Sequence, residues 1–420
     1  MSAYEQLFRQ LDEVGTLSRG KSKHRPRNDP ILYGGPHPFI QTGDVKHSTF
    51  YVTSYSQTYS DKGLAQSKLW PAGTLCITIA ANIADTAILA FPACFPDSII
   101  GFTAKDGVAS TAYVKYCLDT YKTQMRSISQ GTTQDNLSQG KLLSLKFRIP
   151  DFQVQQKITA ILSAYDDLIA NNQRRITLLE RMAEDIYREW FVRLRFPGHK
   201  QGKLEKGLPQ GWRVAALGQI FKTSSGGTPS RTEHANFDGD IPWIKTGELK
   251  TTFALGSEET LTRRGVENSA AKVYKKHTVV MAMYCAMPDL SVIANDAATN
   301  QACCAFIPHD SAIHHSFCFF LIKFAQLQLV MFAHGAAQQN LSQEIIKRFP
   351  VLLPSKHLIS AFGERVGPLF DSIEALMRAN VQLKATRIAL LPRLISGKLA
   401  VDALGIRFPP GMSLADKINL

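Results

Sequence analysis

The nine residues PFIQTGDVK at 38–46 return 204 positions later as PWIKTGELK at 242–250, with five identities and three conservative exchanges. The same shift places GTTQDNLSQ at 131–139 over GAAQQNLSQ at 335–343, with six identities. Unrelated sequences of average composition match at roughly one position in sixteen, so chance does not explain two such runs. The register needs no gap. Because solenoid repeats have much shorter periods, we predict a duplicated unit made of a domain and a connector.

The connector of each unit is expected to be a long helix. After Pro150 the chain reads FQVQQKITAILSAYDDLIANNQRRITLLERMAEDIYREWF, without Pro or Gly, and its apolar positions alternate in steps of three and four. This heptad seam predicts a coiled-coil helix over about 157–193, roughly 55 Å long. The seam residues are Ile169, Asn172, Ile176, Leu179 and Ile186 in the first copy and Ile373, Leu376, Asn380, Leu383 and Leu390 in the second.

The two helices are expected to pair with each other. An isolated amphipathic helix exposes its apolar stripe, so it needs a partner. We expect an antiparallel pair, since a folded domain has to fit between the helices; packing of each helix on its own domain is the alternative. Each seam holds one asparagine, a residue that can fix register. In an antiparallel pair centred near Arg174 and Arg378, Asn172 faces Asn380.

The remainder of each unit has the pattern of mixed, β-rich structure. KLWPAGTLCITIA at 68–80 and VYKKHTVVMAMY at 273–284 hold short β-rich runs broken by Gly, Pro or charge. We therefore predict an α+β fold with an internal pseudo-twofold duplication. Its expected segments are a β-rich domain at 1–150, a helix and linker at 151–206, a second β-rich domain at 207–353, a helix at 354–402 and a tail at 403–420.

Composition indicates a polyanionic partner and a reducing compartment. The net charge is +13 and the pI about 9.4; such a surplus favours nucleic acid, although a basic protein without such a partner is the alternative. The seven cysteines include no CxxC pair, which predicts reduced, buried residues rather than disulfides or a zinc site. The charged N-terminus does not resemble a signal peptide, and FCFFLIKFA at 317–325 is short for a membrane span. We expect a cytoplasmic protein that does not enter the membrane.

Loops near the start of each unit supply candidate contacts to DNA. RGKSKHRPR at 19–27 is strongly basic, and the 204-residue shift aligns it with TSSGGTPSR at 223–231, Arg231 falling under Arg27. A solvated loop and a structural turn are the respective alternatives. Gln in the repeated NLS motif has the chemistry to bond adenine, but closing a turn before a helix or strand is its alternative role. The candidates are Lys21, Lys23, Arg25, Arg27, Thr42, Lys46, Gln134, Thr228, Arg231, Lys245, Thr246, Lys250 and Gln338.

Catalytic motifs are missing from the sequence. It contains no GxGxxG, GxxxxGK[ST], HExxH or GxSxG pattern, and no Asn-Pro-Pro-aromatic tetrad of amino-methylating DNA methyltransferases. We therefore predict a binding protein without catalytic residues or a metal site. The alternatives are a self-sufficient DNA methyltransferase or nuclease with an unrecognised site, and a coiled-coil scaffold whose charge serves RNA or a membrane.

The order of these features resembles a known family over essentially the whole chain. PWIKTGEL, GGTPSR, the GxxQxNLS run before an IP or LP step, and LPQGW at 208–212 are together similar to the DNA-specificity subunit of type I restriction–modification systems. The resemblance implies two target-recognition domains that each read one half of a split, asymmetric DNA sequence, with the helices as spacer. It also implies two methyltransferase (M) subunits and restriction (R) subunits as partners. S-adenosylmethionine, ATP and Mg²⁺ would belong to those partners, and no cofactor to this chain. Two departures are the loop at 19–27, which lacks the GGTPSR form, and the short N-terminal segment before the first domain.

Overall fold

The computed structural model describes residues 7–129, 137–200, 204–205, 207–284, 288–335, 341–406 and 408. Two compact units make up the chain. Unit 1 comprises Met1–Ile169 with Leu383–Leu420, and unit 2 comprises Ala170–Gln382. Each unit therefore combines one β-rich domain with a part of both long helices, so the expected division into separate domain and helix segments does not follow the compact units.

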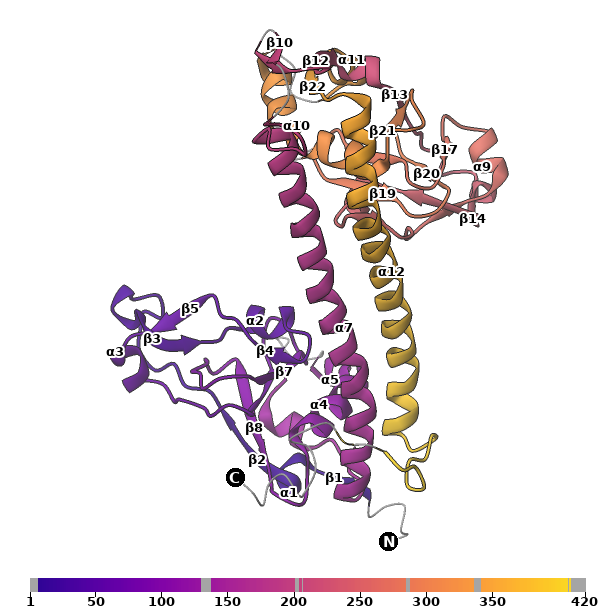
Figure 1. The fold of residues 1–420 in the computed structure, drawn as a ribbon. Helices are drawn as coiled ribbons and strands as arrows, with labels where there is room; N and C mark the ends of the chain where they lie inside the picture. The colour runs from indigo at the N-terminus through magenta and orange to yellow at the C-terminus, as the bar shows by residue number, and fades with distance from the viewer. Residues whose placement is uncertain are drawn as a thin grey trace. The chain divides into compact units, whose positions relative to one another are not determined.

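Unit 1 is built on a five-stranded sheet of order β2-β8-β6-β7-β4 (Figure 1). β4 pairs with β7 in parallel, and the other neighbours are antiparallel. Leu75 and Ile77 of β6 belong to the core beneath α4, whereas Cys76 belongs to a second core on the opposite face. Both faces of the sheet are covered, so β6 and β7 are buried at every position. The strands are β2 (Gly15–Arg19), β4 (Tyr51–Val52), β6 (Leu75–Thr78), β7 (Thr86–Leu89) and β8 (Ile99–Ala104).

Shorter elements complete unit 1. A two-stranded sheet pairs β3 with β5, and another pairs β1 with β9. These strands are β1 (Phe8–Arg9), β3 (Tyr33–Phe39), β5 (Gln57–Tyr59) and β9 (Phe147–Arg148). The helices are α1 (Leu11–Val14), η2 (Pro30–Leu32), α2 (Thr42–His47), α3 (Asp61–Ala65), α4 (Thr111–Thr120), α5 (Lys122–Ser129) and α6 (Gln139–Leu143).

Unit 2 repeats this plan, with the sheet order β13-β21-β18-β19-β15 (Figure 1). A four-stranded sheet, β16-β14-β20-β17, corresponds to the β3–β5 layer of unit 1. The strands are β10 (Leu204–Glu205), β11 (Leu208–Pro209), β12 (Arg213–Ala216), β13 (Phe221–Ser225), β14 (Phe237–Ile244), β15 (Phe253–Ala254), β16 (Thr260–Leu261), β17 (Val273–Tyr274), β18 (Val279–Ala282), β19 (Leu290–Ile293), β20 (Ala297–Thr299), β21 (Cys303–Pro308) and β22 (Pro350–Leu353). The helices are α8 (Leu217–Ile220), η4 (His234–Asn236), η5 (Thr246–Glu248), α9 (Arg263–Glu267), α10 (His315–Gly335) and α11 (Gln343–Arg348).

The strand pairing confirms the duplication and corrects its register. The shift of 204 places β6 on β18, β7 on β19 and β8 on β21. In the first strand, however, Gly15 pairs with Ala104 while Phe221 pairs with Pro308, so the shift there is 206. At β4 and β15 it is 202. The expectation of a gapless repeat is therefore wrong: pairing fixes the strands, and the loops between them absorb two residues.

This register also bears on one loop alignment. The shift is 206 at β2 and β13 but 204 again at η2 and η4, so a two-residue slip lies within the loop that holds Arg27 and Arg231, and strand pairing does not fix their equivalence. The basic loop and the GGTPSR turn therefore begin at the same place, after the first strand of each sheet, but they differ in length before the next strand.

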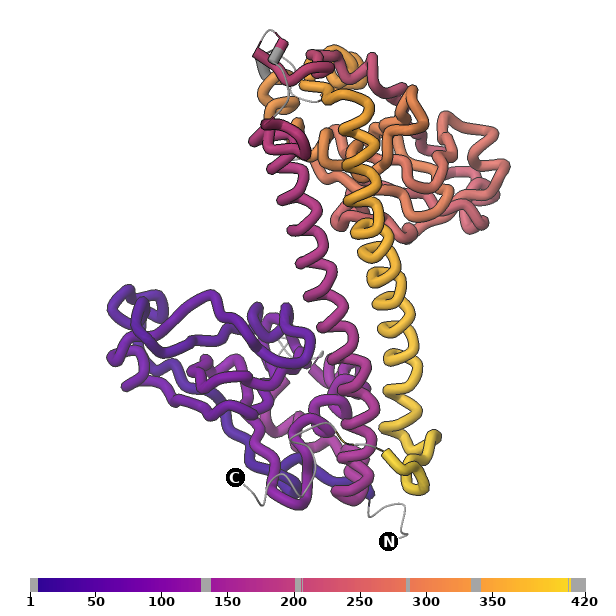
Figure 2. The backbone as a smooth tube through the Cα atoms, viewed as in Figure 1, coloured from indigo at the N-terminus to yellow at the C-terminus, as the bar shows by residue number. Residues whose placement is uncertain are grey.

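Two long helices, α7 (Phe152–Tyr187) and α12 (Lys356–Ile395), run unbroken in the backbone trace (Figure 2). α7 continues as a π-helical turn, η3 (Arg188–Val192). It begins five residues before the expected 157, where Val154 packs against the core of unit 1. α12 ends before the expected 402, because Gly397 adopts a φ of +76° and its N–H caps the Leu394 carbonyl at 3.1 Å.

The helix pairing is antiparallel within each unit. In unit 2, Asn172 Nδ2 donates to Asn380 Oδ1 at 3.0 Å, and the ring of Tyr187 lies 5.8 Å from that of Phe362. Residue numbers thus rise along one helix as they fall along the other. In unit 1 the charged seam position Arg387 is matched by Asp166, with Nε and Oδ1 2.6 Å apart. The ten seam residues are all buried or half-buried, as a paired seam requires.

Helix α10 is long and apolar enough to cross a membrane by length and composition alone. Within that stretch, His315–Ala333, 56% is buried. Phe317, Phe320 and Ile322 belong to the central core of unit 2. The apolar run noted in the sequence is therefore a core helix of this unit.

Candidate nucleic-acid interface

The basic loop at 19–27 presents two lysines on the surface of unit 1. Lys21 and Lys23 are exposed, and their backbones are fixed to the loop that follows α3. Ser67 Oγ donates to the Lys21 carbonyl at 2.8 Å, and the Lys23 amide donates to Gln66 Oε1 at 2.6 Å. The structure thus holds the loop in place while leaving both ammonium groups toward solvent, where a phosphate can reach them.

Arg25 and Arg27 of this loop are exposed but bond other groups of the protein. Arg25 donates to the carbonyl oxygens of Ser22 at 2.7 Å and His24 at 2.8 Å. Arg27 forms an ion pair with Asp97 at 2.9 Å. Both side chains therefore help to shape the loop, and the carboxylate of Asp97 offsets the charge that Arg27 can offer to a polyanion.

The GGTPSR turn of unit 2 is built for internal packing. A Cβ on Gly226 would lie 1.8 Å from the Thr299 carbonyl oxygen, and Trp243 Nε1 donates to the Gly227 carbonyl at 3.1 Å. Arg231 lies over the Trp243 ring, 5.4 Å from its centroid. The structure thus agrees with the alternative that the sequence left open here, a structural turn.

Two further candidates, Arg231 and Lys245, converge on one carboxylate. Glu259 lies 2.9 Å from Arg231 and 3.1 Å from Lys245. The hydrogen bond from Arg231, and to a lesser extent the one from Lys245, lowers the pKa of Glu259. Thr228 is exposed, and its hydroxyl donates to Gln301 Oε1. Both cations therefore have a partner within the domain.

The TGDVK and TGELK motifs form matching turns. Asp44 Oδ2 accepts from the Gln41 amide at 2.8 Å, and Glu248 Oε2 accepts from the Lys245 amide at 2.7 Å. These are capping boxes, in which the acidic side chain turns back onto its own backbone. The acids of the repeated motif are therefore structural, and Val45 and Leu249 of the same motifs are buried in the cores of their domains.

The threonine and the lysine of each motif lie at or near the surface. Thr42 and Thr246 are half-buried at the start of each turn, and Lys46 and Lys250 are exposed. Lys250 also forms an ion pair with Asp289 at 2.6 Å. The structure brings one threonine and one lysine together at the same turn of each unit.

The repeated NLS motif caps a short helix in each unit. Ser138 Oγ accepts from the Lys141 amide at 3.2 Å, and Ser342 Oγ accepts from the Ile345 amide at 3.3 Å. The serine of the motif therefore closes the turn before a helix in each unit. Gln134 and Gln338 lie outside the described residues.

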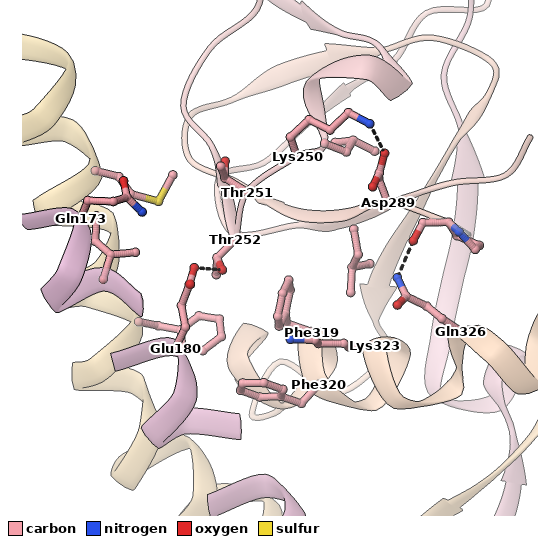
Figure 3. A pocket seen from close by; sticks show the side chains of 16 residues that line it. Gln173, Glu180, Lys250, Thr251, Thr252, Asp289, Phe319, Phe320, Lys323 and Gln326 are labelled. Atoms are coloured by element: carbon pink, nitrogen blue, oxygen red, sulfur yellow. Dashed lines mark hydrogen bonds and ion pairs between the residues drawn. The ribbon is translucent and has the colours of Figure 1, made fainter. Parts of the chain in front are cut away.

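A cavity of about 520 Å³ opens in unit 2 between α7, α10 and the loop before β15 (Figure 3). Its floor is apolar, with Phe319 and Phe320 pointing inward. Its polar rim is already paired, since Glu180 accepts from Thr252 at 2.5 Å and Gln326 donates to the Pro288 carbonyl at 2.7 Å. This pairing favours a structural cavity over a site for a polar ligand.

An ionic cluster in unit 2 was missed by the sequence analysis. Glu374 of α12 is 6% exposed and bonds Lys276 at 3.1 Å, His277 at 3.3 Å and Arg378 at 2.8 Å. Burial raises the pKa of Glu374, but the hydrogen bonds from Arg378, Lys276 and His277 outweigh it and leave the pKa below its usual value. The only sequence signal was an acidic residue next to the seam. The cluster fastens the β17–β18 loop to the helix.

Two adjacent histidines are packed against this cluster. The His315 ring stacks on His277 at 4.2 Å and lies 4.0 Å from that of His314. Burial lowers the pKa of both, that of His315 to about 2. His277 has a φ of +70°, where the equivalent residue of unit 1 is Gly73. The rings of His314 and His315 are therefore neutral packing groups near neutral pH.

Metal-binding and disulfide chemistry find no support in the part of the chain that the structure describes. There, no group of three or more His, Cys, Asp or Glu side chains is placed to hold a metal ion. The six cysteines within these residues are buried and unpaired with one another. Burial raises the pKa of Cys117 to about 12, which leaves it a protonated, unreactive thiol.

Comparison with known proteins gives a consistent result. The family described as type I restriction modification DNA specificity domain matches twice, at residues 4–181 and 209–360. The chain is 24% identical to the MjaIX specificity subunit of Methanocaldococcus jannaschii over 94% of both proteins. It is 21% identical to the HindI specificity subunit of Haemophilus influenzae, over 66% of this chain and 74% of that protein.

A solved structure supports the same fold. The S subunit of the type I restriction–modification system of M. genitalium aligns with a TM-score of 0.62 and 14% identity, over 92% of this chain and 95% of that one. The relatives are named as specificity subunits, in agreement with the prediction of a non-catalytic role. The double match covers most of the sequence, and the chain therefore belongs to the type I restriction modification DNA specificity family.

Proposed function

We propose that this chain is the DNA-reading subunit of a type I restriction–modification complex. Each β-rich domain would read one half of a split, asymmetric target, and α7 and α12 would set the spacing between the half-sites. The observation that carries the proposal is the duplication itself. Two domains share the same sheet order while the loops between their strands differ. One framework with two sets of loops is what recognition of two different half-sites requires.

The charge of the molecule supports a nucleic-acid partner. The net charge of +13 supplies attraction to any duplex, independent of its sequence. Lys21, Lys23 and Lys46 are exposed cations on unit 1 and would contribute to it. Arg25, Arg27, Arg231 and Lys245 bond groups inside the protein, and in this proposal they shape the loops that approach DNA.

Catalysis would come from other subunits. Methyltransferase subunits would bind S-adenosylmethionine, and restriction subunits would use ATP and Mg²⁺. In support, the family is one of specificity subunits, and the sequence has no nucleotide or methyltransferase motif. We further propose that the complex works in the cytoplasm, where its DNA is.

The experiment that tests this function maps methylation. The full chain is co-expressed with its methyltransferase subunits, and modified adenines are located by sequencing the host DNA. We expect two different short sequences at a constant separation. The purified chain alone, incubated with DNA and labelled S-adenosylmethionine, serves as the control. Methyl transfer by that chain without a second polypeptide would show instead that it is an enzyme.

A further inference from the structure

Glycines that recur in both copies of the repeat mostly have an internal reason. A Cβ on any of six such residues would lie within 2.6 Å of backbone atoms of a neighbouring segment. Real Cβ atoms do not approach so closely, so the fold itself demands glycine there. These residues form the pairs Gly20/Gly226, Gly35/Gly239 and Gly63/Gly265.

One further pair has no such reason. Gly43 and Gly247 occupy the same place in the TGD and TGE turns, because both turns are closed by the same capping box. No described atom lies within 4 Å of a Cβ built on either residue, and neither φ falls in the left-handed region. Any small side chain would therefore fit the isolated protein at both positions.

Keeping glycine at these positions works against stability. Gly43 lies in the first turn of α2 and Gly247 in the 3₁₀ turn η5. Glycine loses more backbone entropy on folding than alanine does and is the weaker helix former. A glycine that the chain does not need, yet carries in both copies, indicates that something outside the chain approaches the backbone closely.

We propose that the Gly43 and Gly247 turns are where the backbone of each domain meets the sugar–phosphate backbone of DNA. This inference rests on the proposed function and assigns to it one contact per half-site. This contact would not depend on the DNA sequence, because it requires the close approach of two backbones and does not involve base edges.

The flanking residues favour DNA over a protein partner. Each glycine follows a threonine, Thr42 or Thr246, and precedes an exposed lysine, Lys46 or Lys250, of which Lys250 is ion-paired with Asp289 at 2.6 Å. Hydroxyls and lysines are common ligands of phosphate oxygens. The acid of each motif is turned inward: both oxygens of Glu248 accept backbone N–H groups, from Lys245 at 2.7 Å and Glu258 at 2.6 Å. Its charge is thus held within the turn.

The test uses full-length Gly43→Ala, Gly247→Ala and the double variant. Binding to mixed-sequence 40-bp duplexes is measured by fluorescence anisotropy at two salt concentrations, and each Tm is recorded. We expect an unchanged or higher Tm and a loss of about fivefold in affinity per substitution, similar for all duplexes, as for one lost hydrogen bond. Matched controls are Gly140→Ala and Gly256→Ala, which also have open space at Cβ and no left-handed φ. The other copy carries Glu344 and Ser54 at those positions, so both controls should bind like wild type.

Three results would overturn the inference. Wild-type affinity in the double variant would show that bare backbone is not needed for DNA. A lowered Tm would show that glycine serves the fold. Normal DNA affinity with reduced co-purification of methyltransferase subunits would assign the turns to a protein partner. If the wild-type chain binds no duplex at all, the proposed function itself is refuted, and the contact proposed at the two turns is refuted as well.

Discussion

Replacing His315 by phenylalanine should make unit 2 less sensitive to acid. The ring of His315 stacks on His277 and packs against Phe253 and Phe370, with centroids 6.2 and 5.7 Å away. Its Nε2 is buried and has no hydrogen-bond partner among the described residues. Burial, followed by repulsion from His314, lowers its pKa from 6.5 to about 2. Phenylalanine keeps the ring packing and removes the group that titrates.

The sign and size of the effect follow from proton linkage. The folded state does not bind this proton between pH 7 and 5, whereas the unfolded chain binds it below its pKa of 6.5. Acid therefore stabilises the unfolded state, and folding stability falls as the pH drops below 6.5. For one such group the loss is roughly 0.2 kcal/mol at pH 7 and 1.4 kcal/mol at pH 5.5. Wild type should thus lose about 1.2 kcal/mol more than His315→Phe over this interval.

Urea unfolding followed by tryptophan fluorescence measures this difference. Three of the four tryptophans, Trp190, Trp212 and Trp243, lie in unit 2, so the signal reports mainly on it. His357→Phe, which removes an exposed histidine of α12, is the matched control and should follow wild type. Parallel loss of stability in wild type and His315→Phe between pH 7 and 5.5 would refute the reasoning.

Three other perturbations test separate parts of the structure. Lys21→Gln with Lys23→Gln should weaken binding to all duplexes alike and reduce the slope of log K against log salt by about two; an unchanged slope would contradict phosphate contact. Asn172→Leu should lower the free energy of unfolding by about 1–3 kcal/mol, because Asn380 loses a buried hydrogen-bond partner. The double variant Asn172→Leu with Asn380→Leu should recover most of this loss. If urea unfolding shows that the losses of the two single variants simply add, the two residues are not coupled. Glu374→Ala should lower the free energy of unfolding by about 2 kcal/mol at pH 7. This is less than the loss expected for one partner of a fully buried ion pair, because the cationic partners of Glu374 are partly exposed. Because the pKa of Glu374 is lowered from its usual 4.5, that cost should shrink as the pH falls below 4.5 and disappear once the carboxylate of the folded protein is protonated; a cost that persists in acid would mean that packing, not charge, is lost.

The helices and the duplication were predictable because their signals are periodic. A seam with steps of three and four needs a partner helix, and the pairing of Asn172 with Asn380 follows once the helices are antiparallel. The repeat gave the correct equivalence for β6 to β8, where the shift is constant. It does not hold at β2, because a two-residue slip changes no hydrophobic pattern and becomes visible only when β2 pairs with β8.

The partners of the candidate cations could not be predicted. Arg27 meets Asp97 across 70 positions, and Lys276 meets Glu374 across the length from β17 to α12. Such pairs depend on how loops from different strands meet, and no local pattern records this. For the same reason, the sequence did not show that the lysines of the basic loop at 19–27 are exposed while Arg25 and Arg27 bond other groups of the protein.

The two-residue slips locate the differences between the domains. They fall between β2 and β3, between α2 and β4, and between α3 and β6. At each of these places, the loop of unit 1 differs in length by two residues from the equivalent loop of unit 2. From β6 to β8 the copies stay in step. Loop changes of this kind alter which side chains reach a groove without disturbing the sheet that holds them. The TGD and TGE turns lie within this variable stretch, yet both keep the same capping box. The varying loops are therefore suited to reading bases, and the constant turns to a contact that every half-site shares.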